Sequence, residues 1–318
     1  MFMVSTNLPL PPTISKEAQA FIEQAPEKQQ LPFHPDAIAA ARQFNQDNWL
    51  PEAIAYAKSI GVTWTEIYVE GQPVLEVTPP FYNNKNDGKA LLYFYGGGHI
   101  AGSPEEDLTI TGPLAKQLGI KVFAHRYPLS PENPFPAAVD TANKVYTHLI
   151  SSLGPKNLLV AGESAGGNLA LATLLKAREQ NLPMPAAAAL LSPWVDVGGN
   201  SDSHAVDIDP TLSMDSIGNT AARAYLSDDD SKLKDPLASP IYADYDSTFP
   251  STLITTGTRD FLLGDSARLS TKMRLSGVDV QLNVWEGLWH VFEFYPQVPE
   301  ARQSLQEIGT FLAKHLNA

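Results

Sequence analysis

The sequence predicts an α/β fold in which helices cover both faces of a mostly parallel, eight-stranded sheet. From residue 90 onward, short apolar runs bounded by turn residues alternate with longer helical patterns. Runs that are apolar throughout indicate strands buried on both faces, as in a parallel sheet between two helical layers. Hydrophobic residues make up 43% of the 318 residues and charged residues 18%, which is enough apolar material for a packed core.

The first sixty residues do not follow this pattern. Helices are expected at 15–25 and 35–59, and Gly61 follows the second as a helix-ending glycine. We interpret residues 1–60 as a helical cap segment appended to a catalytic domain of residues 61–318.

The strands of the predicted sheet begin with an antiparallel hairpin. Its two alternating runs flank Gly71, and the later runs are separated by helical patterns. The expected strands are 65–69, 74–77, 90–95, 120–125, 157–161, 186–191, 251–256 and 280–284, and the helices between them are 108–118, 137–151, 165–179 and 265–275. The polar stretch 198–235 interrupts the alternation, and we interpret it as a lid-like insertion over the carboxyl-terminal edge of the sheet.

Charge and composition exclude several classes of function. The net charge of −13 repels phosphates, so we expect neither nucleic acid nor a membrane as a partner. Absence of cysteine excludes disulfides, thiolate nucleophiles and cysteine-based metal sites. No apolar run reaches the roughly 20 residues that span a bilayer, and residues 1–13 lack a signal-peptide pattern. We therefore expect a cytoplasmic protein; the sequence leaves open whether it is a monomer or a homodimer.

The motif Gly-Glu-Ser-Ala-Gly at 162–166 is the first candidate for chemistry. It follows one predicted strand and opens a predicted helix, which is the context that a nucleophile elbow requires. Its glycines permit a turn tight enough to expose a serine Oγ, and the helix N-terminus favours negative charge developing there. Ser164 is therefore the candidate nucleophile.

Two further candidates follow later strands. Asp260 comes after the strand 251–256, and His290 comes after the strand 280–284. The carboxyl ends of parallel strands meet at one edge of a sheet, so these side chains are expected to lie beside Ser164. The order serine, acid, histidine is the order that this type of hydrolase uses.

Other residues compete for these roles. Asp265 is a rival acid, but its position suits the N-cap of the following helix. The candidate metal ligands are His204, Asp207 and Asp209, but no fourth ligand or fixed spacing supports a metal site. We favour the interpretation that they belong to a polar lid loop. Three aromatic residues are candidates for the pocket or for the core: Trp194, Trp289 and Phe292.

Several segments together resemble the bacterial hormone-sensitive-lipase family of α/β-hydrolase esterases, near its monoterpene ε-lactone hydrolases. They are Tyr-Gly-Gly-Gly-His at 95–99, Tyr-Pro-Leu-Ser-Pro-Glu-Asn-Pro-Phe-Pro-Ala-Ala from Tyr127, the motif at 162–167, Ser-Pro-Trp-Val-Asp at 192–196, Pro-Leu-Ala-Ser-Pro at 236–240, Gly-Thr-Arg-Asp at 257–260 and the loop at His290. The resemblance implies that the N–H groups of Gly97, Gly98 and Ala165 bind the oxyanion. It also implies a helical cap and neither a cofactor nor a metal.

This sequence departs from the family at two positions. The family has histidine before the three glycines, whereas here Tyr95 precedes them and His99 follows. The expected oxyanion donors are backbone N–H groups, so the oxyanion hole can survive this change. Glu163 stands where aspartate is commoner, and we expect it to orient the elbow rather than to transfer protons.

These residues predict a serine carboxylesterase that acts on small ester or lactone substrates through an acyl-enzyme on Ser164. A cap that closes the pocket favours short acyl chains. Two alternatives remain: an amidase or peptidase that uses the same triad, and a non-catalytic small-molecule receptor on a hydrolase fold. Dehalogenases and epoxide hydrolases are disfavoured because they need an aspartate at the elbow.

Overall fold

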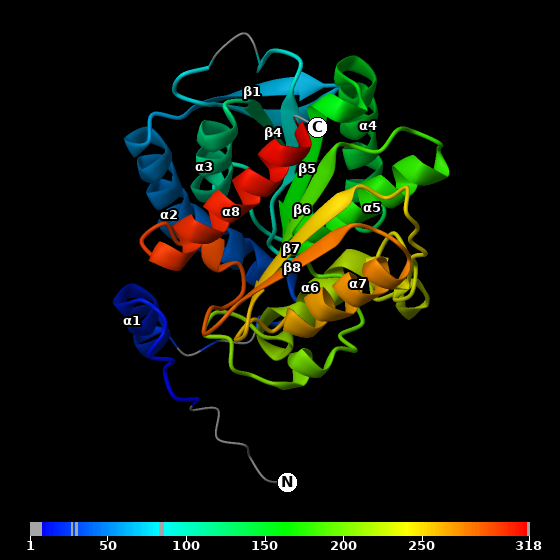
Figure 1. Ribbon diagram of the computed structural model, residues 1–318. Helices are drawn as coiled ribbons and strands as arrows, with labels where there is room; N and C mark the ends of the chain where they lie inside the picture. Colours follow the sequence, from blue (N-terminus) through cyan, green and yellow to red (C-terminus); the bar gives the residue numbers. More distant parts are fainter. Residues whose placement is uncertain (1–7, 27, 29–30, 83–85, 317–318) are drawn as a thin grey trace.

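The computed structural model describes residues 8–26, 28, 31–82 and 86–316 and contains one eight-stranded sheet (Figure 1). Its strand order is β1-β2-β4-β3-β5-β6-β7-β8; β2 runs antiparallel to both of its neighbours, β1 and β4, and all other neighbouring strands are parallel. The strands are β1 Thr63–Val69, β2 Gln72–Thr78, β3 Ala90–Phe94, β4 Lys121–His125, β5 Leu158–Glu163, β6 Ala187–Leu191, β7 Ser251–Gly257 and β8 Val280–Trp285. The predicted fold class is thereby confirmed.

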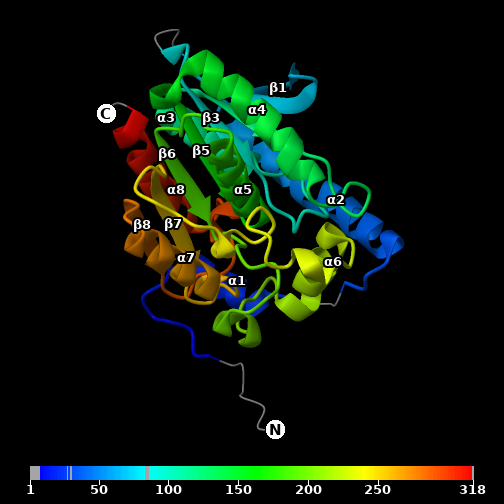
Figure 2. The ribbon, with the colours of Figure 1, turned by 90° about the vertical axis from the view of Figure 1, so that its right-hand side faces the viewer.

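Helices lie on both faces of this sheet, as Figures 1 and 2 show. Helices α3 (Leu108–Leu118) and α8 (Pro299–Leu316) pack together on one face, and α4 (Ala137–Leu153), α5 (Ala165–Glu179) and α7 (Leu263–Leu275) cover the other. The interior strands β3, β5 and β6 are buried along their whole length. This explains why they appear in the sequence as continuous apolar runs.

The helix bounds at 35–59, 108–118 and 165–179 agree with prediction, and the other predicted helices and strands differ by one or two residues at one or both ends. Two differences bear on the site. Strand β5 continues to Glu163, so it leads directly into the elbow. The 198–235 stretch contains helix α6 (Asn219–Leu226) and short helical turns, which its polar composition did not reveal. Three of the eight α6 residues are alanine, and the helix buries one face against the body of the protein.

The two N-terminal helices occupy different places. Helix α1 (Lys16–Gln24) packs beside α8, where Phe21 stacks on Trp289 with ring centroids 4.1 Å apart. Helix α2 (Pro35–Ser59) packs against α3 and reaches the cavity described below. Of the predicted cap, residues 1–7, 27 and 29–30 lie outside the described residues, and its separation from a catalytic domain at residue 61 remains a prediction.

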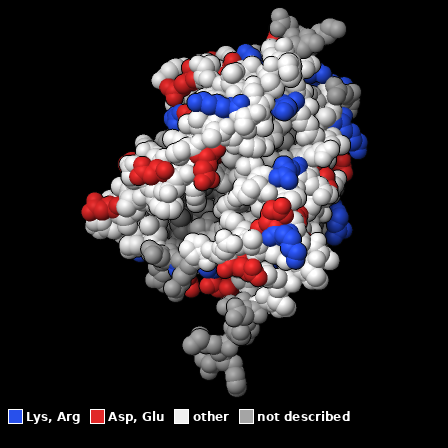
Figure 3. All heavy atoms as spheres, turned by 90° about the vertical axis from the view of Figure 1, so that its left-hand side faces the viewer, with Lys and Arg blue, Asp and Glu red and all other residues white. Residues whose placement is uncertain are grey.

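The surface carries a mixture of charges. On the face shown in Figure 3, acidic and basic side chains are interspersed, and the surface is hollowed near its centre. None of the helices in the described part of the chain is both long enough and apolar enough to cross a bilayer.

Candidate active site

Ser164 stands at a sharp turn between β5 and α5. Its backbone angles are φ 52° and ψ −120°, a conformation that non-glycine residues rarely adopt. The flanking glycines are required by space: a Cβ at Gly166 would collide with the Phe94 carbonyl, and a Cβ at Gly162 would collide with the Gly166 carbonyl. The predicted strand–turn–helix setting is therefore present.

The three predicted catalytic side chains meet at the carboxyl ends of the strands. The Nε2 atom of His290 lies 2.9 Å from Ser164 Oγ, and its Nδ1 atom lies 3.0 Å from Asp260 Oδ1. The Asp260 carboxylate also accepts hydrogen bonds from Thr256 Oγ1 at 2.7 Å and from the Leu262 N–H at 2.8 Å. These contacts fix the acid, which in turn fixes the imidazole.

His290 and Asp260 each stabilise the charged form of the other. Burial acts to lower the pKa of His290, but the charge of Asp260 and its hydrogen bond outweigh burial, so the pKa is raised above 6.5. Burial acts to raise the pKa of Asp260, but the charge and hydrogen bond of His290 hold it below its usual value. The arrangement therefore stabilises an imidazolium beside an ionised carboxylate, as general-base activation of a serine requires.

The glycine loop lies beside the serine. Gly97 and Gly98 adopt positive φ angles of 97° and 63°, and both glycines line the same cavity as Ser164. Within the described residues, the N–H groups of Gly97, Gly98 and Ala165 donate no hydrogen bond to another protein atom. Unpaired N–H groups beside a nucleophile suit an oxyanion hole.

Tyrosines anchor this loop where the family has histidine. The hydroxyl of Tyr127 donates to the carbonyl of Tyr95 at 2.8 Å and to that of Gly96 at 3.3 Å, and the hydroxyl of Tyr95 donates to the Tyr127 carbonyl at 3.3 Å. His99 stacks on Tyr225 with centroids 4.0 Å apart, and burial lowers the pKa of His99 to about 3, so its ring is neutral. Sequence reasoning missed the Tyr127 anchor, although the motif beginning there was its signal.

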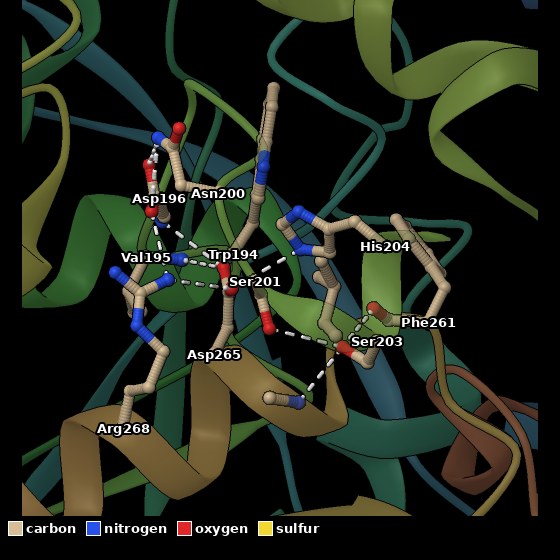
Figure 4. A network of polar contacts seen from close by, with 12 residues as sticks. Trp194, Val195, Asp196, Asn200, Ser201, Ser203, His204, Phe261, Asp265 and Arg268 are labelled. Atoms are coloured by element: carbon tan, nitrogen blue, oxygen red, sulfur yellow. Dashed lines mark hydrogen bonds and ion pairs between the residues drawn. The ribbon is translucent and has the colours of Figure 1, made fainter. Parts of the chain in front are cut away.

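Asp265, the rival acid, lies beside His204 rather than His290. Its Oδ2 atom accepts from the N–H groups of Val195 and Asp196 at 3.0 and 3.1 Å, and its Oδ1 atom lies 3.1 Å from Nε2 of His204 (Figure 4). The predicted N-cap role is wrong, because α7 begins at Leu263 and the carboxylate of Asp265 points away into this network. Asp265 therefore lies apart from the Ser164–His290 pair.

The residues considered as metal ligands are dispersed. His204 faces Asp265, Asp207 pairs with Lys28, and Asp209 binds backbone N–H groups. Among residues 8–26, 28, 31–82 and 86–316, no group of three or more histidine, aspartate or glutamate side chains is arranged to hold a metal ion.

A cavity of about 210 Å³ is lined by Ser164 and His290. Its walls include Trp49 from α2 and Trp194, one of the predicted pocket aromatics. The other two, Trp289 and Phe292, belong instead to the cluster that packs against α1. Apolar side chains cover most of the remaining wall: Ala41, Ala101, Leu212, Ala221, Phe261, Leu262, Val291 and Phe294. Polar residues also line it: Asn45, Glu106, Asp107, Glu163, Thr211 and Tyr295.

Glu163 is buried directly beneath the glycine loop. A Cβ on Gly96 would collide with the Glu163 carboxyl group, so these two residues are in close contact. Burial, followed by the nearby charge of Asp107, raises the pKa of Glu163 well above its usual value. Glu163 therefore contacts the glycine loop as well as the elbow in which it lies.

The comparisons with known proteins agree with this geometry. The model of a family with the α/β hydrolase fold matches residues 91–294. An acetyl-hydrolase of Streptomyces hygroscopicus is 32% identical over 82% of this chain and 89% of its own, and an ethyl acetate hydrolase of Pseudomonas putida is 28% identical over 90% and 93%. The crystal structure of an esterase from the bacterial hormone-sensitive lipase family matches with a TM-score of 0.81 and 29% identity, covering 95% and 99% of the two chains.

Proposed function

We propose a substrate class for this chain. The chain belongs to the bacterial hormone-sensitive-lipase family of α/β hydrolases and is a serine carboxylic ester hydrolase. The proposed substrates are esters of short acyl chains, together with small lactones, which contain the same bond within a ring. The observation that carries the proposal is the small apolar cavity above Ser164.

The proposed mechanism proceeds through an acyl-enzyme. His290 takes the proton of Ser164 while Oγ attacks the ester carbonyl, and the N–H groups of Gly97, Gly98 and Ala165 bind the tetrahedral oxyanion. The imidazolium then protonates the leaving alcohol. A water molecule, deprotonated by His290, attacks the acyl-enzyme and releases the acid and Ser164.

Cavity size supports short acyl chains. At about 210 Å³ the space falls below the roughly 300–1,000 Å³ of pockets for drug-sized ligands. The rings of Trp49 and Phe294, with centroids 5.5 Å apart, both form part of its wall. The names acetyl-hydrolase and ethyl acetate hydrolase, carried by two relatives, agree with an ester of a short acid rather than an amide.

The test uses p-nitrophenyl esters of increasing acyl length and a panel of small lactones. We expect kcat/KM to be greatest at short chains, up to six or eight carbons at most. Ser164→Ala should lose activity by several orders of magnitude while its thermal unfolding is unchanged. Near-normal turnover by that variant, or a maximum at long chains, would contradict the mechanism or the substrate class respectively.

A further inference from the structure

We infer that Asp209, which lies in the 198–235 insertion, is a positioning residue of this site. It holds in place the backbones of the acid loop, residues 258–262 between β7 and α7, and of the histidine loop, the segment after β8 that contains His290. The inference rests on the proposed roles of His290 and Asp260. Asp209 is 2% exposed, and the sequence indicates it only as a residue of a polar loop and as one of three candidate metal ligands.

One carboxylate oxygen of Asp209 joins the two catalytic loops. Its Oδ2 atom accepts a hydrogen bond from the N–H of His290 at 2.8 Å and a longer one from the N–H of Phe261 at 3.4 Å. Phe261 directly follows Asp260, and its ring lies 4.8 Å from the imidazole of His290. A single atom of the insertion therefore sets the spacing between the backbones that carry the catalytic base and its acid.

The other oxygen closes a turn of the insertion itself. Oδ1 accepts from the N–H of Thr211 at 2.8 Å, from the hydroxyl of Thr211 at 2.6 Å and from the N–H of Leu212 at 3.2 Å. Thr211 and Leu212 line the cavity, so the same side chain supports the cavity wall and the catalytic histidine. Both oxygens accept, which a carboxylate satisfies and a carboxamide, with one oxygen and one donor group, does not.

A second residue of the insertion holds the same acid loop from its other side. The hydroxyl of Ser203 donates to the carbonyl of Phe261 at 2.7 Å and accepts from the N–H of Gly264 at 2.9 Å (Figure 4). The backbone of Phe261 is thus bonded to the insertion at both its N–H and its carbonyl. This agrees with an insertion that is fixed against the catalytic loops and serves to position them.

Charge adds a second contribution. The acidic groups that act on the imidazole of His290 are Asp260, Asp209 and Glu293, while the ammonium of Lys28 donates to the backbone carbonyl of Asp209 at 2.7 Å. The negative charge of Asp209 stabilises the imidazolium that forms when His290 takes the serine proton, and it helps to raise the pKa of His290. Asp209 therefore acts on both the orientation and the basicity of the base.

Asp209→Asn tests this inference, with Asp207→Asn as the matched control. Asp207 lies two residues away, is more than half exposed and pairs with Lys28, so its variant loses the same charge without touching the triad. For Asp209→Asn we expect kcat to fall about 10- to 100-fold at similar KM, as small misplacements of catalytic groups do. The acid limb of kcat/KM should also move to lower pH, because removing a nearby negative charge lowers the pKa of His290.

Three results would overturn the inference. One is a wild-type kcat and pH profile in Asp209→Asn. Another is a rise in KM with altered chain-length preference but unchanged kcat and pH profile, since that would assign Asp209 to the cavity wall alone. If the variant does not fold, hydrogen exchange of the wild-type His290 amide decides: slow exchange supports the bond to Asp209, and fast exchange contradicts it. Full activity of Ser164→Ala would instead refute the proposed mechanism, whatever Asp209 does.

Discussion

Asp260 and Asp265 lie five residues apart, and each faces a histidine, so paired substitutions can separate their roles. Asp260 contacts His290 at 3.0 Å, whereas Asp265 lies 3.1 Å from His204 and 3.9 Å from Arg268. Both carboxylates are fully buried. Asparagine has the same shape as aspartate, so Asp260→Asn and Asp265→Asn change the charge and hydrogen-bonding capacity with little change in packing.

The two variants should differ in activity. An amide at 260 favours the imidazole tautomer that carries its proton on Nε2, which cannot accept the proton of Ser164. The cost is about 10⁴ in kcat, or about 5.4 kcal/mol at 1.36 kcal/mol per tenfold. Asn at 265 leaves the triad contacts intact but removes the buried partner of His204, and breaking such a pair costs about 3–5 kcal/mol of folding free energy.

The assay combines two measurements on each purified variant: kcat with p-nitrophenyl acetate and the melting temperature by circular dichroism. We expect Asp260→Asn to be nearly inactive and, like Asp265→Asn, to unfold at a lower temperature than wild type, because each substitution breaks a buried carboxylate–histidine pair. Asp265→Asn should remain within about tenfold of wild-type kcat but unfold at lower temperature. If Asp265→Asn is the inactive variant and Asp260→Asn keeps its activity, the assignment of the acid is wrong.

Three other predictions concern the base, the oxyanion loop and the cavity. Because the base must be neutral and the pKa of His290 is raised, kcat/KM should fall with acid, with a midpoint above about 6.5; a flat profile from about pH 5 to 8 contradicts this. Tyr127→Phe should lower kcat about tenfold or more, because it leaves buried carbonyls of the glycine loop without a hydrogen bond. The control Tyr146→Phe loses a similar bond, to the Pro183 carbonyl away from the site, and should not lower kcat. Trp49→Ala should shift the acyl optimum of p-nitrophenyl esters to longer chains, and the exposed Phe44→Ala on the same helix should shift it less; equal shifts would show that Trp49 does not limit the chain.

The parts of the site that the sequence predicted are those with a local signature. Ser164 is identified by two nearby glycines and by the change from strand to helix within a few residues. Asp260 and His290 follow from the rule that the carboxyl ends of parallel strands share one edge. That rule needs only the order and type of the elements, and the structure brings all three side chains together within hydrogen-bonding distance.

The supporting contacts have no local signature. The bond from the His290 N–H to Asp209 joins residues 81 apart, and the Tyr127 hydroxyl reaches a carbonyl 32 residues before it. Both involve backbone atoms, which every residue possesses, so no residue type marks the partner. Contacts between residues far apart in sequence also explain why the predicted N-cap role of Asp265 is wrong. Asp265 has the residue type and position of a helix start, but its carboxylate accepts hydrogen bonds from two buried N–H groups 70 and 69 residues earlier.

The absence of a local signature also explains why the composition of the 198–235 insertion predicts a lid. Its polar residues resemble a solvated surface loop when each is considered alone, because aspartate and serine are mostly exposed in proteins. In the folded chain Asp209 and Ser203 direct their polar atoms inward, to backbone groups of the acid loop and the histidine loop. A buried carboxylate persists only where such donors surround it. The polar residues of the insertion near Ser164, Asp260 and His290 therefore form hydrogen bonds with backbone groups of the acid loop and the histidine loop. A count of polar residues does not show such contacts, so the composition of the insertion alone does not reveal its place in the site.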